Sequence, residues 1–304
     1  MTRLWLACLL LVLGAGPAAA CAGRLVESEH VFRSPVCVPA EPKRVVVLDP
    51  TFSLGMSLEL GLPVVAAPLF AMSDEDLRAR ARALPVTDIG SYNEPSIEKI
   101  IAAKPDIILG VTPAAPLYDT LSRIAPTVLI GADDWRTHFD VLARATGRAG
   151  AMKDMFDAYD RRAAAIRARM PDVTVSVLRI TSWDFQVYLD GPRAYAPFSV
   201  LRDAGVRRTA YETTDDDTSL KRPDWEELAA LDGDILLYII GGLNKSDTNG
   251  RHEEVVGNPL WQMLPAVKAG RVHRVDAATW MEFSGLASAN RILDDVERYI
   301  VNAP

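Results

Sequence analysis

Histidine, serine and lysine can bind metals, act as nucleophiles or bind phosphate, and each of these roles requires a characteristic spacing in the sequence. The sequence has four histidines, and their separations match no metal-ligand pattern: His30, His138, His252 and His273. A secreted α/β hydrolase needs a Gly-x-Ser-x-Gly turn, which is absent; Ser284 lies beside a glycine but lacks the preceding one. Residues 241–246, GGLNKS, lack the spacing of a phosphate-binding loop. The sequence therefore disfavours an enzyme and a bare-metal binder, although iron or haem ligation by one tyrosine and one histidine stays open.

Aromatic and cationic side chains offer a different kind of chemistry, namely noncovalent binding of a ligand. We selected those that follow predicted strands, because loops at the carboxyl ends of parallel strands form ligand sites in α/β proteins. The candidates are Phe52, Tyr92, Trp183, Arg193, Tyr195 and Trp280, with Arg179 at the end of its own strand. Each of them can alternatively be an ordinary packing residue.

Two sets of short β-branched runs alternate with helical patterns, which predicts an α/β fold with parallel sheets. The first set is residues 44–48, 64–66, 106–110 and 127–130, and the second is residues 174–180, 186–189, 234–240 and 271–275. Each set is large enough for its own sheet. We therefore expect two Rossmann-like lobes, an N-terminal lobe of residues 21–136 and a C-terminal lobe of residues 171–304.

The stretch between the two sets, residues 137–170, has apolar residues at helical spacing and few strand formers. Gly147 is expected to interrupt it, giving a short helix and then a longer one that ends before Pro171. A long helix joining the lobes would act as a stiff spine and permit only a small rocking motion. The periodicity is equally compatible with a core helix.

Residues 1–20 have the features of a secretory signal peptide. Arg3 precedes an apolar run that ends at Gly14, and the small residues Ala18 and Ala20 fit a cleavage site. The mature chain would keep Cys21 and Cys37. Either the two form a disulfide, as an oxidising compartment favours, or Cys21 carries a lipid anchor; Ala18 stands where lipoprotein signals usually have leucine. We favour the disulfide and a periplasmic location.

Length and charge narrow the function further. The mature chain of about 280 residues exceeds one usual core, in keeping with two lobes. The full sequence has 40 acidic and 33 basic residues and a net charge of -7, which argues against nucleic acid as a partner.

A short sequence pattern occurs once in each of the two predicted lobes. Glu98 stands eight residues before Asp106, and Glu226 stands eight residues before Asp234; each aspartate opens an apolar strand. In each case a helix, a tight turn and a strand are expected, once per lobe. Alone, so short a match is also compatible with general α/β sequence patterns.

The ordered set of segments resembles the ferric-siderophore-binding proteins of ABC importers, especially the ferric-citrate and ferric-hydroxamate binders. The resemblance rests on residues 42–48, 90–106, 121–127, 258–265 and 271–276, running into Trp280. It implies two Rossmann-like lobes joined by a long helix, a monomeric carrier, and a ferric siderophore as cargo rather than an intrinsic cofactor. It also implies that Glu98 and Glu226 dock to the permease of an ABC transporter, which works with its own ATPase, and that Trp280 lies in the pocket. A haem or corrinoid carrier of the same fold is the alternative within this class.

The sequence departs from the family at one position that bears on ligand choice. Several hydroxamate and citrate binders carry an arginine just after the glycine of the 90–106 segment, and this chain has Tyr92. Tyrosine cannot replace the bidentate, charged contact of a guanidinium. Arg193 or Arg179 would have to supply that positive charge from the other lobe, and the identity of the siderophore stays open.

Overall fold

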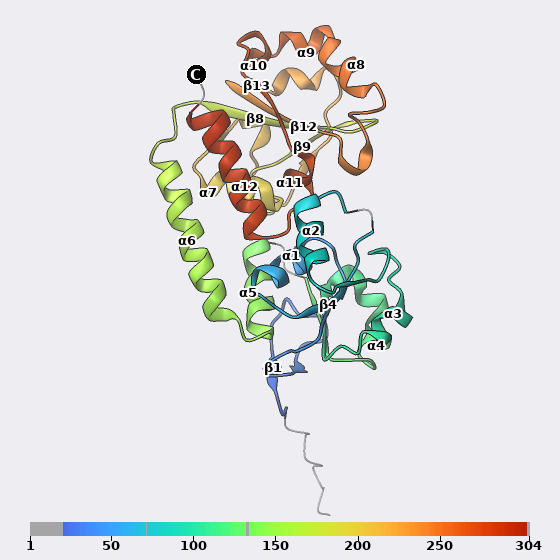
Figure 1. The fold of residues 1–304 in the computed structure, drawn as a ribbon. Coiled ribbons are helices and arrows are strands. Elements are labelled where there is room, and N and C mark those ends of the chain that lie inside the picture. The colour runs from blue at the N-terminus through green and yellow to red at the C-terminus, as the bar shows by residue number, and fades with distance from the viewer. Residues whose placement is uncertain (1–20, 71, 132–133, 303–304) are drawn as a thin grey trace, which may run out of the picture.

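The structure, a computed structural model, describes residues 21–70, 72–131 and 134–302. The predicted signal peptide, residues 1–20, lies outside this part of the chain. Two β-sheets, each covered by helices, form two lobes (Figure 1). Within the described residues, no helix is both long and apolar enough to cross a membrane.

The first lobe is built on a parallel five-stranded sheet with the strand order β5-β4-β3-β6-β7. Its strands are β3 (Val45–Val47), β4 (Val64–Ala67), β5 (Thr87–Asp88), β6 (Ile107–Val111) and β7 (Thr127–Ile130). Its helices are α1 (Phe52–Glu59), α2 (Glu75–Ala83), α3 (Ile97–Ala102), the 3₁₀ helix η1 (Thr112–Leu117) and α4 (Tyr118–Leu121). The four strands expected for this lobe are all present, and the two-residue β5 lacked a sequence signal.

A small antiparallel pair, β1 (Arg24–Val26) and β2 (Val36–Val38), precedes the first sheet. A disulfide joins Cys21 to Cys37, with a separation of 16 residues. The expected pairing of the two cysteines is therefore confirmed. In this bond, Cys21 has no thiol free to carry a lipid.

The second lobe contains a mixed six-stranded sheet with the order β11-β9-β8-β12-β13 and β10 paired to β8. Its strands are β8 (Thr174–Ile180), β9 (Phe185–Tyr188), β10 (Arg207–Arg208), β11 (Leu220–Lys221), β12 (Ile235–Ile240) and β13 (Val272–Val275). β8, β12 and β13 are parallel, as expected. β9 runs antiparallel to β8 instead, because the four residues between them are too few for the crossover that a parallel pair requires.

Helices surround this second sheet and lead back to the first lobe. They are α7 (Ala196–Asp203), η2 (Ala210–Glu212), η3 (Glu227–Ala230), η4 (Gly242–Asn244), α8 (Arg251–Gly257), α9 (Pro259–Met263), α10 (Pro265–Lys268), α11 (Ala277–Met281) and α12 (Leu286–Val296), the last continuing as the π-helical turn η5 (Glu297–Val301). α12 contacts α6 and α7, and it also reaches α1 of the first lobe.

Two helices connect the lobes, α5 (Trp135–Ala145) and α6 (Ala149–Arg167). The expected break is present at Gly147, whose φ of +73° favours glycine and ends α5. α6 has 19 residues, a length of about 28 Å at 1.5 Å per residue. It runs along one side of the molecule past both lobes and contacts α5, α7 and α12 (Figure 1).

A single apolar core extends through both lobes. Alternate residues of β3 and β12, such as Val45 and Leu237, face it, together with α1, α5, α6, α7 and α12. Their neighbours Val46 and Leu236 face separate outer clusters, one in each lobe. Because the lobes share a close-packed core, moving one relative to the other would expose apolar surface, and we expect only a small relative motion.

Candidate functional site

A cleft with a volume of about 790 Å³ lies between the two lobes. In the first lobe many of its lining residues follow β3 and β6, which are adjacent strands, and the others lie after β5 and at or after β7. The chain continues from β3 to β4 on one side and returns to β6 on the other, so this is the point where the strand order reverses. Ligands of open α/β sheets bind at such points, outside the carboxyl ends of the strands. The second lobe closes the cleft with Tyr188, residues 193–196 and residues near β11.

Five aromatic side chains line the cleft: Phe52, Tyr92, Trp135, Tyr188 and Tyr195. Tyr188 and Tyr195 have ring centroids 5.5 Å apart, and the hydroxyl of Tyr195 donates a hydrogen bond to the carbonyl oxygen of Met281 at 3.0 Å. Trp135 is only 3% exposed, and its indole Nε1 donates to Ser199 Oγ at 3.1 Å. These contacts fix the rings before a ligand arrives, which lowers the entropy cost of binding.

Sequence reasoning found three of these rings and missed two. Phe52, Tyr92 and Tyr195 line the cleft, as does Arg193 from the second lobe. Trp135 comes after β7, a first-lobe strand whose following loop we did not select. Tyr188 is the last residue of β9 and stacks on Phe198 at the edge of the core. Because it lies inside the predicted strand, only the alternation of that strand indicated that its ring faces the opposite side from Phe185 and Val187.

Trp280, the expected pocket tryptophan, is a core residue instead. It is fully buried, its ring lies 6.0 Å from that of Phe198, and its Nε1 donates to Asp295 Oδ2 at 2.8 Å. The short helix α11 turns it toward α12 and α7 rather than toward the cleft. The tryptophan that lines the cleft is Trp135.

Two further candidates lie outside the cleft lining. Trp183 is 73% exposed, in the short turn between β8 and β9. Arg179 lies one layer behind the cleft, where its Nη1 donates to the Tyr188 hydroxyl at 3.0 Å and to Gln186 Oε1 at 3.1 Å. Arg179 therefore positions a cleft tyrosine, and Arg193 is the arginine that lines the cleft.

The base of the cleft holds a buried aspartate and a buried histidine. Asp49 is 2% exposed; its Oδ1 accepts a hydrogen bond from the Ser53 backbone N–H at 3.0 Å. Burial raises the pKa of Asp49. His138 is 3% exposed, and burial lowers its pKa to about 4, so its imidazole is neutral at pH 7.

The expected docking residues are exposed, one in each lobe. Glu98 lies in the first turn of α3, and Glu226 immediately precedes η3. Within the described residues neither carboxylate has a hydrogen-bond or ion-pair partner. The repeat that suggested them is thus imperfect in structure, because the second copy is a 3₁₀ helix rather than an α-helix.

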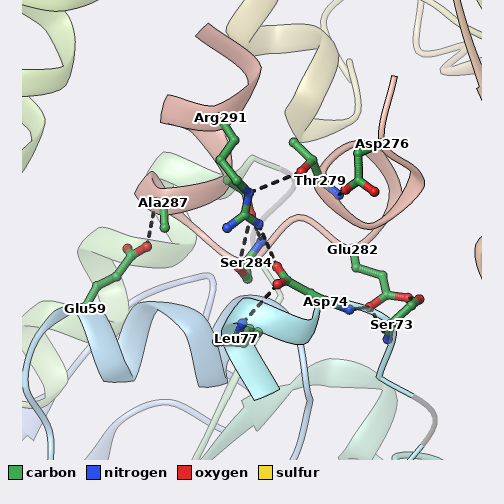
Figure 2. A network of polar contacts seen from close by, with 11 residues as sticks. Glu59, Ser73, Asp74, Leu77, Asp276, Thr279, Glu282, Ser284, Ala287 and Arg291 are labelled. Atoms are coloured by element: carbon green, nitrogen blue, oxygen red, sulfur yellow. Dashed lines mark hydrogen bonds and ion pairs between the residues drawn. The ribbon is translucent and has the colours of Figure 1, made fainter. Parts of the chain in front are cut away.

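A polar network joins the lobes at the far end of α1 from the cleft (Figure 2). Phe52 at the start of α1 lines the cleft, and Glu59 at its end accepts hydrogen bonds from the backbone N–H groups of Leu286 at 3.0 Å and Ala287 at 2.7 Å. Since α12 has no side-chain cap of its own, a residue of the first lobe caps a helix of the second.

The same network holds α2 to the second lobe (Figure 2). Glu282 accepts hydrogen bonds from the backbone N–H groups of Ser73 at 2.8 Å and Asp74 at 3.0 Å. Asp74 caps α2 and pairs with Arg291, Nη2 to Oδ2 at 2.6 Å. These contacts tie both α1 and α2 of the first lobe to the second lobe, so we expect the cleft to change little in width when a ligand binds.

Comparison with known proteins identifies the kind of molecule to which this cleft belongs. The profile of a family described as periplasmic binding protein matches residues 45–279. The chain belongs to this periplasmic binding protein family. The match spans both sheets and every segment that lines the cleft.

Sequence alignments with relatives of this periplasmic binding protein cover nearly the whole chain. The probable siderophore-binding lipoprotein YfiY of Bacillus subtilis is 28% identical over 292 residues, covering 90% of this chain and 87% of YfiY. The Fe(3+) dicitrate-binding periplasmic protein FecB of Escherichia coli is 27% identical over 306 residues, covering 93% and 95%. Staphylococcus aureus SirA complexed with staphyloferrin B has a TM-score of 0.76 at 20% identity, covering 89% and 97%, which shows a shared fold.

Proposed function

We propose that the protein binds a ferric siderophore in the cleft between its lobes and delivers it to an ABC importer. The observation that carries the proposal is a cleft of about 790 Å³ between the lobes with five aromatic side chains in its lining. A siderophore already saturates the coordination of its iron, so its carrier needs apolar walls and a few polar groups rather than metal ligands. Relatives named for siderophores and ferric citrate support this cargo.

We further propose that the protein works in the periplasm and does not transform its cargo. The predicted signal peptide supports export. A serine–histidine contact is present behind the cleft, where Ser53 Oγ lies 3.4 Å from His138 Nε2. However, Ser53 is fully buried in α1, so a substrate cannot reach its hydroxyl as a nucleophile requires.

Fluorescence titration tests the proposed cargo. Purified residues 21–304 would be titrated with ferric hydroxamate, citrate and catecholate complexes, with haem and with cobalamin. We expect saturable quenching by at least one ferric siderophore, and less of it in Trp135→Phe, because Trp135 lines the cleft. Trp183→Phe is the matched control, since Trp183 is exposed outside the lining. Absence of quenching by every ferric siderophore would refute the proposal, and binding of haem alone would favour the haem carrier.

Delivery to the transporter is proposed to depend on Glu98 and Glu226. Two exposed carboxylates on separate lobes can form ion pairs with permease arginines that fix orientation and speed association. The Glu98→Ala/Glu226→Ala variant should lose uptake in cells while keeping its ligand affinity. The control Glu29→Ala/Glu253→Ala removes two charges from other exposed positions. Normal uptake by the first variant, or equal loss in both, would contradict docking through these residues.

A further inference from the structure

The turn between β8 and β9 exposes a tryptophan. Trp183 is 73% exposed, the largest fraction among the bulky apolar side chains of the described residues. Tryptophan is on average highly buried in folded proteins. It is enriched at protein interfaces, because its large ring buries much area at a low cost in conformational entropy. The exposed indole is therefore a candidate contact residue.

Hydrogen bonds hold this turn in one conformation. Thr181 Oγ1 accepts from the backbone N–H of Trp183 at 3.3 Å and from that of Asp184 at 3.0 Å. The carboxylate of Asp184 also forms an ion pair with Arg222. The backbone that carries the indole is thus already ordered, so little conformational entropy is lost when a partner covers it.

A second exposed apolar side chain lies on the adjacent loop. Leu243 in η4 is 66% exposed. The loop and the turn are in contact, because Ser182 Oγ donates a hydrogen bond to the carbonyl oxygen of Asn244. A single exposed apolar residue is ordinary, whereas neighbouring ones indicate an interaction site. Neither Trp183 nor Leu243 belongs to the cleft lining, so this surface is separate from the ligand site.

The same surface continues to Glu226, the proposed docking residue of this lobe. Phe185 packs against Trp225 with ring centroids 4.8 Å apart. The ion pair of Asp184 with Arg222 joins the same two segments. Glu226 follows Trp225 directly and is exposed. The apolar pair and the docking carboxylate therefore lie on adjoining segments, and one partner can cover both.

The charge of this surface indicates which partner covers it. Residues 222–227 carry three exposed carboxylates and one basic residue, Arg222, which is paired with Asp184. Lys245 adds one exposed positive charge in the loop of Leu243. The excess of negative charge is repelled by anionic phospholipid, and it attracts a protein surface that presents basic residues. A protein partner fits this surface better than a membrane does.

We propose that Trp183 is the apolar anchor through which the second lobe binds the permease of the importer, with Leu243 beside it. This inference rests on the proposed function and adds a contact residue to it. Exposed carboxylates such as Glu226 direct association and contribute little to affinity. A tryptophan that becomes buried in a complementary pocket contributes much more. The affinity of this lobe for the permease should therefore depend chiefly on Trp183, and its orientation on Glu226.

The test measures uptake of the radiolabelled ferric siderophore that the fluorescence titration identifies. Cells would contain each variant at the same low level in place of the wild-type protein. Trp183→Ala should lower uptake at least about tenfold, as expected for the loss of an interface tryptophan. Its ligand affinity and Tm should equal those of the wild type, because Trp183 lies outside the cleft lining. Leu25→Ala is the matched control and should transport normally: Leu25 is 55% exposed in β1, at the end of the first lobe far from the second (Figure 1).

Unchanged uptake by Trp183→Ala, or an equal loss in Leu25→Ala, would overturn the inference and leave the proposed function standing. Reduced ligand affinity in Trp183→Ala would overturn it too, because the indole would then contact the ligand. The same holds if the wild-type chain, but not Trp183→Ala, sediments with vesicles of phosphatidylglycerol and phosphatidylethanolamine or forms dimers. Should Trp183→Ala not fold, Leu243→Ser must lower uptake with unchanged ligand affinity, and normal uptake there refutes the inference. If the wild-type protein binds no ferric siderophore, the proposed function itself fails.

Discussion

Gly55 in α1 marks a close approach between the lobes, and replacing it by alanine tests whether that contact sets their arrangement. A Cβ at this position would lie 2.0 Å from the carbonyl oxygen of Ser284 and 2.8 Å from its carbonyl carbon. Both are backbone atoms of the second lobe, so no side-chain rotation relieves the clash. Either α1 or the segment before α12 must move.

The expected cost follows from this geometry. Overpacking against backbone costs about 3 kcal/mol, and alanine returns about 1 kcal/mol relative to glycine within a helix. The free energy of unfolding should therefore fall by about 2 kcal/mol, which lowers Tm by roughly 3 °C in a chain of about 280 residues, at about 2.1 cal/mol/K of unfolding entropy per residue. Because Phe52 at the start of α1 lines the cleft, affinity for the ligand should fall as well.

Gly150 provides the matched control for Gly55→Ala. It lies in α6, and a Cβ there would meet nothing within 4 Å. Gly150→Ala should raise the free energy of unfolding by about 0.5–1 kcal/mol, since only helix propensity changes. Thermal and urea unfolding of both variants, followed by circular dichroism, would measure the difference. If Gly55→Ala is as stable as Gly150→Ala and binds ligand normally, the lobes are not held in contact at α1.

Two further substitutions probe the interlobe network and the buried histidine. Arg291→Met leaves the carboxylate of Asp74, whose side chain is 4% exposed, without its guanidinium partner. We expect the free energy of unfolding, measured with urea, to fall by about 2 kcal/mol, against less than about 0.5 kcal/mol for the control Arg144→Met, which breaks an exposed ion pair. Equal losses in the two variants would contradict an interlobe role for Arg291. The folded-state pKa of His138 is about 4, below its ordinary value of 6.5. Between these two values the unfolded chain takes up a proton at His138 and the folded protein does not, so the free energy of unfolding falls as the pH drops from 6.5 toward 4. His138→Gln should flatten the fall in stability over that range by about 3 kcal/mol, and parallel pH profiles would refute the assignment.

The sheets and the connecting helices were predictable because their signals are local. The strands of residues 44–48 and 234–240 are largely continuous apolar runs, and the helix break at Gly147 requires a positive φ that glycine supplies. The two-residue strands β5, β10 and β11 gave no such signal, since they are too short for alternation to register. The direction of β9 was also missed, although the length of its turn decides it.

The residues of the cleft were predicted less well, because whether a side chain lines the cleft depends on which side of its loop or short helix faces the other lobe. Trp280 was expected in the pocket and is buried in the core, whereas Trp135 lines the cleft from the first turn of α5. The reason is the direction of each helix: α11 packs Trp280 against α12, and α5 begins shortly after β7 ends, at the edge of the cleft. Arg179 shows the same limit, since a strand-end arginine can contact either the ligand or, as here, the tyrosine that lines the site.

The central claim is that the interlobe cleft is the site of a ferric chelate, and a crystal structure of the protein with its tightest-binding ferric siderophore tests it most directly. Anomalous scattering locates the iron independently of the fitted ligand. The account predicts one iron peak in the cleft, with the chelate in contact with Phe52, Trp135 and Tyr188 and its iron held by the siderophore alone. An iron peak elsewhere on the protein, or iron bound directly by protein side chains, would contradict the account.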